Sequence, residues 1–413
     1  MPTEPTYLIV GASLCGAKAA ETLRSEGFGG TVILLGSETE RPYERPPLSK
    51  GYLLGKEEKS VIYVHEEGWY PDNDVDLRLG VTVTSVDRAG RTVTTADGES
   101  VGYDRLLLTT GASPRRLDVP GADREGVLYL RTVGDSERLA AAFRGGGRVA
   151  VAGAGWIGLE VTAAAREAGC EVTVIEPEPT ALYRALGPEL GAVFADLHRE
   201  NGVEFRFGEW VSEIRGPGAG GQAGPVGEVV TSSGHTVPAD VVVVGIGVEP
   251  NAGLAAGAGL EIGNGVVADA ALRTSDTSIY AAGDVANAYR PLLERMVRVE
   301  HWDNALNSGP AAARSMLGQN VAYDPVPYFF SDQYDLGMEV AGLPEPGGYD
   351  QVLYRGDLPG REFIAFWLVG GAVMAGMNVN VWDVNEDIQA LIRSGKRVDP
   401  ARLTDPDIPL TDL

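Results

Sequence analysis

The residues best suited to chemistry are glycines spaced for a phosphate-binding turn. In "YLIVGASLCGAKAAETLRSEG", Gly11 and Gly16 bracket Ser13, which occupies the middle glycine position of a G-x-G-x-x-G motif. That motif follows a strand, opens a helix and lets backbone N–H groups bind a dinucleotide pyrophosphate. The alternative is a Ser-centred site, but the G-x-S-x-G spacing of a nucleophile elbow is missing. We therefore predict a pyrophosphate-binding turn in which the Ser13 hydroxyl can bond to a phosphate oxygen.

A second copy of the motif is complete. Gly153, Gly155 and Gly158 in "GRVAVAGAGWIGLEVTAAAREAGCEVTVIEPE" follow an apolar strand and open an Ala-rich helix. One such motif is weak support, because a chance turn between a strand and a helix can contain the same glycines. Two copies, each in a strand-turn-helix-strand frame, are specific. The pair predicts two dinucleotides.

An acidic residue stands near the end of the strand that follows each motif. Glu38, or else Ser37, would accept hydrogen bonds from the ribose of the first dinucleotide. Glu176 would accept the ribose 2′-hydroxyl of the second dinucleotide and repel a 2′-phosphate, which favours NADH over NADPH. Arg184 is close enough in sequence to leave NADPH open.

The composition is that of a globular protein with an acidic surface. The 413 residues exceed the size at which one core keeps growing, so two or three domains are expected. The net charge of -24 argues against nucleic acids and anionic membranes as partners. No apolar run reaches the roughly 18 residues of a membrane span, and no signal peptide pattern opens the chain, so we expect a cytoplasmic protein.

Cysteine and histidine usage argues against two kinds of site. The chain has two cysteines, Cys15 and Cys170, and four scattered histidines. There is no C-x-x-C motif and no metal-ligand spacing, so we expect neither a thiol–disulfide site of that type nor a metal site. Both cysteines lie in apolar contexts and are expected to be buried structural thiols.

Strand and helix patterns place both motifs in a repeated frame. Each βαβ unit is followed by a hairpin excursion and an apolar returning strand, "LLLTTGA" in the first half and "DVVVVGIGVEPN" in the second. The second excursion contains "GPGAGGQAGPVG", residues 216–227, which we expect to be a flexible surface loop. A helix is expected over about 304–317. Strands "DLGMEVAG", "YDQVLYRG" and "EFIAFWLVGGAVMAGMNV" and a helix near 384–394 then indicate a third, α+β unit.

The motif set resembles that of one enzyme family. The stretches "RPYERPPLSKGYL", "YLRTVGDS", "GAGWIGLE", "GIGVEPN", "YAAGDVA", "VEHWDNA" and "YFFSDQYDLGMEVAG" are together similar to FAD-containing NADH:ferredoxin reductases of the putidaredoxin reductase type. The resemblance implies an α/β fold with two Rossmann-like dinucleotide-binding domains, in a glutathione-reductase-like architecture, plus a C-terminal α+β domain. It implies an FAD-binding domain of residues 1–114 and 244–324, an NADH-binding domain of 115–243, and a C-terminal domain of 325–413 that contributes to the flavin site.

The resemblance also implies catalytic roles for two residues. Lys50 of "PPLSK" would lie beside the isoalloxazine ring and pair with Glu160. A cation there would stabilise the negative charge that appears when the flavin is reduced. The alternative for "RPPLSKGYL" is a simple helix start after a proline turn. No general acid or base is required, because hydride passes between the cofactors.

The same resemblance supplies the cofactor-binding residues. Asp284 would bind ribityl or ribose hydroxyls, and Trp302 would cap the flavin pyrimidine edge. Phe330 would stack near flavin and nicotinamide, although it and Tyr328 stand where relatives commonly carry Trp. Core packing is the alternative for these three aromatic residues. The full expected set is Gly11, Ser13, Leu14, Cys15, Gly16, Ser37, Glu38, Arg45, Lys50, Val83, Thr110, Gly111, Arg131, Gly153, Gly155, Ile157, Gly158, Glu160, Glu176, Gly245, Gly247, Gly283, Asp284, His301, Trp302 and Phe330.

The function implied by the resemblance is hydride transfer from NADH to FAD, followed by single-electron transfer to a ferredoxin that supplies a P450 or ring-hydroxylating oxygenase. Ferredoxins are usually acidic, as this chain is, so a local basic patch must override the net charge. We predict that the ferredoxin docks at Arg290, Arg295 and Arg298. The alternative is that these arginines pair with Glu294 and Glu300.

Two other functions stay open. The first is an NADH oxidase-like enzyme, which the lack of a cysteine between Cys15 and Cys170 weakens. The second is a flavoprotein that senses NADH and has no ferredoxin partner.

Overall fold

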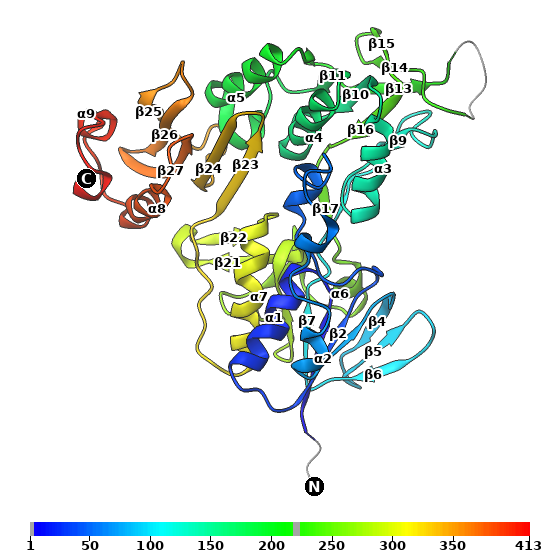
Figure 1. Ribbon diagram of the computed structural model, residues 1–413. Helices are drawn as coiled ribbons and strands as arrows, with labels where there is room; N and C mark the ends of the chain where they lie inside the picture. Colours follow the sequence, from blue (N-terminus) through cyan, green and yellow to red (C-terminus); the bar gives the residue numbers. More distant parts are fainter. Residues whose placement is uncertain (1–3, 218–223) are drawn as a thin grey trace. The chain divides into compact units, whose positions relative to one another are not determined.

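The chain folds into two compact units. The computed structural model describes residues 4–217 and 224–413. Unit 1 consists of Met1–Arg45, Lys59–Ser113 and Glu249–Pro327. Unit 2 consists of Pro46–Glu58, Pro114–Val248 and Tyr328–Leu413. Each unit is thus assembled from three separate segments of the chain, as the sequence colours of Figure 1 show.

A five-stranded parallel sheet forms the centre of unit 1. Its order is β20-β7-β1-β2-β3, and all neighbouring strands are parallel. The strands are β1 (Thr6–Val10), β2 (Thr31–Leu35), β3 (Val75–Arg78), β7 (Arg105–Leu108) and β20 (Ile279–Ala281). Most residues of β1, β2 and β7 are aliphatic and buried, as strands covered on both faces require.

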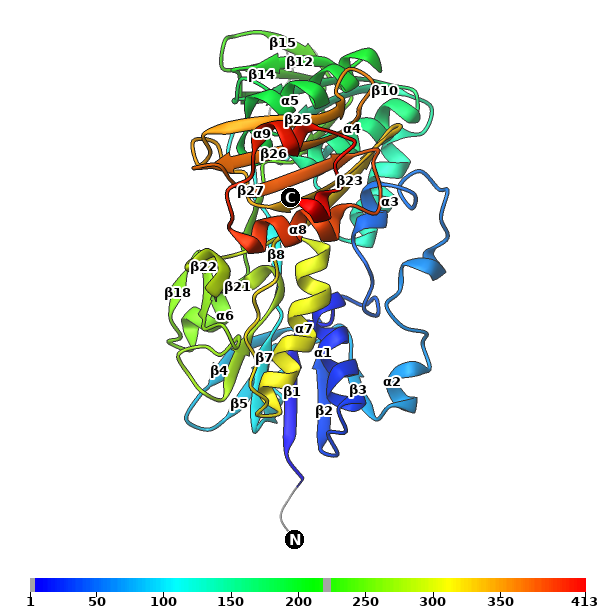
Figure 2. The same cartoon turned by 90° about the vertical axis from the view of Figure 1, so that its left-hand side faces the viewer.

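Two helices of unit 1 lie side by side, although they come from opposite ends of the unit's sequence. They are α1 (Leu14–Ser25) and α7 (Trp302–Met316), drawn in blue and yellow in Figures 1 and 2. A Cβ built on Gly309 would lie 2.2 Å from the Cys15 carbonyl oxygen, so glycine permits this close contact. The expected helix at 304–317 is therefore present and begins two residues earlier.

The remaining elements of unit 1 surround this sheet. The first hairpin excursion is an antiparallel sheet of β4 (Val83–Asp87), β5 (Thr92–Thr95) and β6 (Ser100–Gly102). The other elements are η2 (Lys59–Ile62), α2 (Trp69–Asp72), α6 (Gly253–Gly257), β18 (Ile262–Gly263), β19 (Gly265–Ala268), η3 (Gly283–Val285), β21 (Ala286–Arg290), η4 (Pro291–Leu293) and β22 (Arg295–Val297). Two of the points where the chain passes from one unit to the other lie in strands, β8 (Ala112–Pro114) and β17 (Val248–Pro250).

Unit 2 contains a second five-stranded parallel sheet, in the order β12-β11-β10-β16-β9. The strands are β9 (Val127–Leu128), β10 (Gly147–Ala152), β11 (Cys170–Glu176), β12 (Glu204–Phe207) and β16 (Val241–Val244). They are accompanied by η1 (Pro46–Ser49), α3 (Val133–Phe143), α4 (Trp156–Glu167), α5 (Tyr183–Glu200) and the hairpin excursion β13 (Val211–Arg215), β14 (Glu228–Thr231) and β15 (Thr236–Pro238). Part of the loop expected at 216–227, residues 218–223, lies outside the described residues.

The last part of unit 2 is an antiparallel sheet in the order β23-β24-β27-β26-β25. Its elements are β23 (Tyr328–Gln333), β24 (Leu336–Gly342), β25 (Gln351–Asp357), β26 (Glu362–Val369), β27 (Ala372–Val379), α8 (Asn385–Ser394), α9 (Pro400–Thr404) and η5 (Leu410–Asp412). The run expected as one strand, "EFIAFWLVGGAVMAGMNV", is a hairpin. Its turn is Gly370–Gly371, where both glycines have positive φ.

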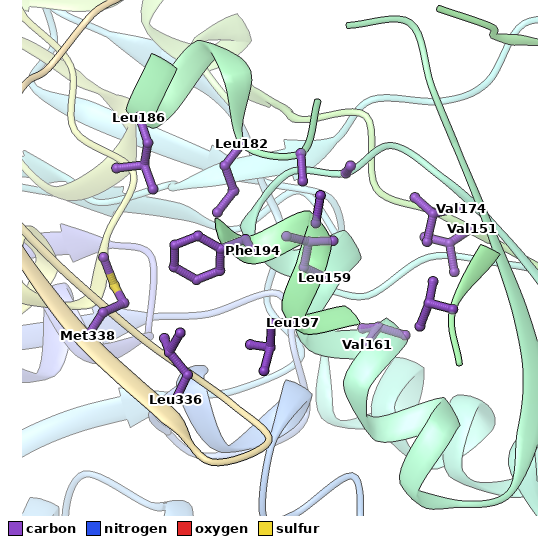
Figure 3. Packing of buried hydrophobic residues seen from close by; sticks show 14 of the residues in the cluster. Val151, Leu159, Val161, Val174, Leu182, Leu186, Phe194, Leu197, Leu336 and Met338 are labelled. Carbon is purple, nitrogen blue, oxygen red and sulfur yellow. The ribbon is translucent and has the colours of Figure 1, made fainter. Parts of the chain in front are cut away.

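The two five-stranded sheets of unit 2 share one hydrophobic core. Figure 3 shows Leu336 and Met338 of β24 beside Phe194 of α5, with Leu159 of α4 and Leu182 around the same ring. All five side chains belong to one buried cluster. The antiparallel sheet is therefore packed as part of unit 2.

The observed architecture confirms the predicted fold class of two Rossmann-like regions plus a C-terminal α+β region. The three-domain division by residue number stays a prediction. Among residues 4–217 and 224–413, no helix is both long and apolar enough to cross a membrane.

Candidate functional site

The first glycine turn joins β1 to α1 and explains why only its middle glycine is replaced. Gly11 has a φ of +124°, and a Cβ on it would lie 2.1 Å from the Thr109 carbonyl oxygen. A Cβ on Gly16 would lie 2.1 Å from the Gly11 carbonyl oxygen. Ser13 is the N-cap of α1 in extended backbone, and its side chain makes no capping hydrogen bond. The two outer positions therefore require glycine, while the middle position accepts a side chain.

A cavity of about 400 Å³ opens beside this turn in unit 1. Its lining includes seven residues of the expected cofactor set, Gly11, Ser13, Ser37, Glu38, Arg45, Val83 and Thr110. The N-terminus of α1 lies at the same place, so main-chain N–H groups and the positive end of a helix dipole are available to an anion. A pyrophosphate fits this turn.

Glu38 is held in this cavity by two donors. Its Oε1 accepts a hydrogen bond from Arg45 Nη2 at 2.9 Å, and its Oε2 accepts one from the Tyr43 hydroxyl at 2.6 Å. Arg45 Nη1 also donates to the Tyr43 oxygen at 2.9 Å. The carboxylate is thereby fixed three residues after the end of β2, where an acid can receive ribose hydroxyls. Sequence reasoning missed Tyr43, although it stands two residues before Arg45 in "RPYERPP".

Gly283 and Asp284 lie in η3, next to the first turn of α1. The Gly283 N–H donates to the Ser308 hydroxyl of α7 at 2.9 Å, and a Cβ on Gly283 would lie 3.3 Å from the Cys15 side chain. Trp302 is the first residue of α7. The structure therefore gathers η3 and the α1 turn in one part of unit 1, joined through α7.

The other expected residues of unit 1 lie at the ends of elements. His301 is the N-cap of α7, and its Nδ1 accepts a hydrogen bond from the Asp303 N–H at 3.4 Å. Leu14 opens α1 and is buried. Thr110 and Gly111 follow β7, and the Thr110 hydroxyl donates to the Asn251 carbonyl at 2.9 Å. Asn251 also lines the cavity and was missed.

Both cysteines are buried, as expected. Cys15 is 3% exposed, its sulfur lies 3.7 Å from the Ser308 hydroxyl oxygen, and burial raises its pKa to about 12. Cys170 is fully buried, and burial raises its pKa as well. A thiolate is the reactive form of cysteine, so neither residue is suited to thiol chemistry at neutral pH.

The second glycine turn joins β10 to α4 in unit 2. A Cβ on Gly153 would lie 2.4 Å from the Gly245 carbonyl oxygen, and one on Gly158 would lie 2.2 Å from the Gly153 carbonyl oxygen. Nothing lies within 4 Å of a Cβ on Gly155, the N-cap of α4. The middle position therefore opens to space where a pyrophosphate can approach the backbone.

Glu176 ends β11 and is tied to this turn. Its Oε2 accepts a hydrogen bond from the Ala154 N–H at 2.6 Å, and its Oε1 accepts one from the Glu178 N–H at 2.9 Å. The Glu178 carboxylate is paired in turn with Arg184, with 2.7 Å between Oε1 and Nε. The chain thus carries two acids at the end of β11, Glu176 and Glu178, and the guanidinium of the nearby Arg184 is held by the second.

Three further residues of the expected set lie on α4 and directly after β16: Ile157, Gly245 and Gly247. Ile157 stands in the first turn of α4 and is 46% exposed. A Cβ on Gly245 would lie 3.3 Å from the Gly158 Cα, so the returning strand passes directly against the turn. Gly247 has a φ of +92°.

Glu160 of α4 is the centre of a buried polar cluster in unit 2. It is 5% exposed, and its Oε1 accepts hydrogen bonds from Lys50 Nζ at 2.6 Å and from the Ser331 hydroxyl at 2.7 Å. Its Oε2 accepts a third from the Ser49 hydroxyl. The expected pair of Lys50 and Glu160 is therefore present in the structure, and Ser49 and Ser331 are partners that sequence reasoning missed. Lys50 follows η1, a single 3-10 turn.

Phe330 stands on β23 beside this cluster. Lys50 Nζ lies 5.4 Å from the centre of the Phe330 ring, and the Tyr328 ring lies 6.4 Å away on the same strand. The Tyr328 hydroxyl donates to Glu339 at 2.7 Å. Burial raises the pKa of Asp332, which stands two residues after Phe330 on the same strand. The strand "YFFSDQ" thus brings an aromatic ring and polar groups to the ammonium group of Lys50.

Arg131 precedes α3 in unit 2, and its N–H donates to Asp135 at 3.0 Å. The capping box of Thr132 and Asp135 starts this helix, which accounts for "YLRTVGDS" as a local structural motif.

The docking prediction needs correction at Arg290. Arg290 is 3% exposed, its Nη1 donates to the Tyr323 carbonyl and its Nη2 donates to Asn304 Oδ1 at 3.0 Å, so it is not a surface residue. The Arg298 side chain is 7% exposed and paired with Glu300, which is the alternative that the sequence left open. Of the three arginines, Arg295 on β22 is exposed.

The fold and the two turns define a class of protein. Each of two parallel sheets carries a glycine turn at the carboxyl end of one strand and an acid at the end of its neighbour. This is a protein with two dinucleotide-binding regions of Rossmann type.

Comparisons with known proteins agree with this class. Residues 5–309 match the model of the pyridine nucleotide-disulphide oxidoreductase family, and residues 328–413 match the reductase C-terminal model. The chain is 40% identical over 411 residues to the anthranilate 1,2-dioxygenase system ferredoxin–NAD(+) reductase component of Burkholderia cepacia, covering 99% of each chain. It is 35% identical over 416 residues to putidaredoxin reductase of Pseudomonas putida, covering 100% of this chain and 97% of that one.

A solved structure has the same fold. The covalent putidaredoxin reductase–putidaredoxin complex matches with a TM-score of 0.94 and 35% identity, covering 99% of this chain and 98% of that chain. The chain belongs to the pyridine nucleotide-disulphide oxidoreductase family and is an oxidoreductase of the putidaredoxin reductase-like group. Proteins of this family use FAD and NAD(P)H.

Proposed function

We propose that the protein is an NADH-dependent, FAD-containing reductase that passes single electrons to a ferredoxin serving a P450 or a ring-hydroxylating oxygenase. The observation that carries the proposal is the pair of glycine turns, each beside a fixed acid, on two separate parallel sheets. A relative named as the ferredoxin–NAD(+) reductase component of a dioxygenase system supports the choice of a ferredoxin as acceptor. When bound, FAD and NADH supply the hydride and electron transfer.

In this proposal the unit 1 cavity holds the adenosine part of FAD. The N–H groups at the start of α1 would bind the pyrophosphate, and Glu38 would accept the ribose hydroxyls. Tyr43 and Arg45 would keep the Glu38 carboxylate oriented before the cofactor arrives. Asp284 and the first turn of α7 would bind the remainder of the cofactor, with Trp302 at the flavin edge.

NADH would occupy the second glycine turn. Gly155 leaves room for its pyrophosphate, and Glu176 would accept the 2′-hydroxyl of its ribose. Ile157 would lie toward the nicotinamide, with Gly245 and Gly247 on the returning strand. The second acid, Glu178, adds negative charge that disfavours a 2′-phosphate.

Lys50 would stabilise the reduced flavin electrostatically. A buried carboxylate holds its ammonium group at a fixed position, so the positive charge is preorganised rather than recruited when the flavin is reduced. Phe330 would be the aromatic ring next to the reacting groups, and Glu160 would position Lys50.

Stopped-flow reduction followed by mixing with a ferredoxin tests the proposal. NADH should reduce the bound flavin faster than NADPH at equal concentration, and cytochrome c reduction should be rapid and sustained only when a ferredoxin is added. A long-lived reduced flavin–NAD complex that no ferredoxin reoxidises would instead favour a protein that senses NADH. A preference for NADPH would remove the role given to Glu176. The buried, protonated state of Cys15 argues against a cysteine-dependent NADH oxidase.

Three finer points belong to this proposal. We propose that residues 1–114 and 244–324 bind FAD, that 115–243 bind NADH and that 325–413 contribute to the flavin site. We propose that the enzyme acts in the cytoplasm. We also propose that ferredoxin docks on the side of unit 1 that carries Arg295, with Arg290 and Arg298 supporting that surface from within.

A further inference from the structure

Beyond Lys50 and Glu160, unit 2 contains a line of buried polar side chains that runs from Glu160 to α5. The Ser331 hydroxyl contacts Glu160 Oε1 at 2.7 Å, and Gln333 Nε2 contacts the Ser331 oxygen at 3.1 Å. Gln333 Oε1 lies 2.9 Å from His198 Nε2. Ser331 and Gln333 are each 1% exposed, and His198 is fully buried. Burying polar groups in a core costs free energy unless each of them forms hydrogen bonds, so the way in which these side chains are bonded to one another determines whether the line is stable.

The direction of every hydrogen bond in this line follows from the first one. The Glu160 carboxylate can only accept, so the single proton of Ser331 must point toward it. The Ser331 oxygen must then accept from the amide nitrogen of Gln333, which turns the Gln333 carbonyl toward His198. His198 must therefore carry its proton on Nε2.

The far end of the line agrees with this tautomer. With the proton on Nε2, His198 Nδ1 is an acceptor, and the Tyr334 hydroxyl lies 3.2 Å from it as a donor. Burial lowers the pKa of His198 to about 4, so the ring is neutral at pH 7. The hydrogen bonds of this line therefore all run in one direction, from Tyr334 toward Glu160.

We propose that His198 and Gln333 are positioning residues that lock the Ser331 hydroxyl onto Glu160 and thereby fix the charge that Lys50 presents to the flavin. The inference rests on the role given to Lys50 under the proposed function. Without the line, the Ser331 hydroxyl is free to turn away, and the buried Glu160 carboxylate loses one of its three donors. Its negative charge is then less compensated, which makes reduction of the flavin less favourable.

The test uses the FAD-loaded protein and measures the flavin midpoint potential and the rate of flavin reduction at saturating NADH. His198→Leu and Gln333→Met remove the line while keeping similar volume. Each should lower the equilibrium constant for flavin reduction about tenfold, which is about 30 mV for a two-electron couple. His198→Gln keeps a hydrogen-bond donor toward Gln333, so this variant should have a flavin midpoint potential close to that of the wild type. Tyr334→Phe removes one hydroxyl at the far end and should cause a smaller shift in the same direction.

The matched control is Thr162→Val, because Thr162 is fully buried on the same helix as Glu160 but outside the line. The flavin midpoint potential of this variant should stay at the wild-type value. A double-mutant cycle gives the decisive comparison. In the Lys50→Met background, His198→Leu should cause little further shift of the flavin midpoint potential, because both residues act through the same charge.

The outcomes separate this inference from the proposed function. If Lys50→Met leaves the potential unchanged, the role proposed for Lys50 fails. Suppose instead that Lys50→Met shifts the potential, while the His198→Leu and Gln333→Met variants bind FAD and have the wild-type potential. The inference then fails and the proposed function stands. Additive shifts in the double variant would also overturn it, because His198 would then act by another route.

Discussion

Lys50 Nζ lies 2.6 Å from Oε1 of Glu160, whose side chain is only 5% exposed. The two residues are far apart in sequence, one after the 3-10 turn η1 and one on α4. A lysine that is paired in this way is held at one place, because its flexible stem loses its freedom when the ammonium group is bound. We expect the pair to contribute to the stability of unit 2, and in the proposed function it also holds the charge of Lys50 for the flavin.

The first prediction concerns the stability of this pair. Lys50→Met leaves Glu160 as a buried charge without its cation, so the free energy of unfolding should fall by about 3 kcal/mol or more. The double variant Lys50→Met/Glu160→Leu removes both charges and should recover part of the loss. Urea unfolding measures both. The control is Lys56→Met, which removes an exposed pair with Glu167 and should cost at most about 1 kcal/mol. Equal losses for Lys50→Met and Lys56→Met would contradict the prediction.

The second prediction concerns the first glycine turn. Gly11→Ala places a Cβ against the Thr109 carbonyl and should nearly abolish FAD binding, whereas Ser13→Gly should preserve it. Ser13→Val should weaken it, because a branched apolar side chain stands where the phosphate approaches. Flavin content after purification and FAD affinity measure the three variants. The order Gly11→Ala, Ser13→Val, Ser13→Gly from weakest to strongest is expected; a loss of FAD with Ser13→Gly would show that the hydroxyl is required.

Much of this arrangement could be predicted from the sequence because the strongest patterns are local. A glycine turn between an apolar strand and a helix reports directly on backbone geometry, and both turns lie where their motifs place them. Side-chain partners far away in the chain carry no such pattern. Ser331 and Gln333 reach Glu160 and His198 only through the packing of β23 on α4 and α5, which spacing cannot show. The prediction that Arg290 lies on a docking surface was wrong for a related reason, because a run of basic residues does not reveal which arginine points inward.

The third prediction concerns the pH dependence of stability. Burial lowers the pKa of His198 from 6.5 to about 4, so the unfolded chain binds a proton on this residue at a higher pH than the folded chain does. The stability associated with neutral His198 is fully present above about pH 6.5 and is lost progressively as the pH falls to about 4. Between these two pH values the free energy of unfolding falls by up to about 1.4 kcal/mol per pH unit because of this residue. Urea unfolding of wild type and His198→Gln at pH 7, 6 and 5 isolates this contribution. The wild type should lose more stability than the variant, and parallel pH curves would contradict the prediction.

The fourth prediction concerns ferredoxin docking. Arg295→Glu reverses an exposed charge and should slow ferredoxin reduction, most strongly at low ionic strength, while NADH-dependent dye reduction stays intact. Arg290→Glu should instead destabilise unit 1, because it places an acid in a buried site where the arginine donates hydrogen bonds to the Tyr323 carbonyl and to Asn304. Electron transfer to ferredoxin as a function of salt separates the two effects. If Arg295→Glu leaves the salt dependence unchanged, the ferredoxin docks elsewhere.

The last prediction concerns the preference for NADH. Arg184 is 82% exposed, and its guanidinium is paired with Glu178, so this cation is already held by an acid. Glu178→Gln removes that partner and one negative charge, and Arg184 then becomes available to a 2′-phosphate. The ratio of NADPH to NADH efficiency should rise by roughly threefold to tenfold, which corresponds to the loss of an exposed ion pair and a nearby repulsion.

Binding of 2′,5′-ADP, compared with 5′-ADP, measures the same preference without catalysis and should change in the same direction. Glu178→Gln/Arg184→Ala is the matched control, because it removes the acid without leaving the arginine free. The double variant should return toward the wild-type preference. If Glu178→Gln alone leaves 2′,5′-ADP binding unchanged, discrimination rests on Glu176, which is fixed to the turn by the Ala154 N–H.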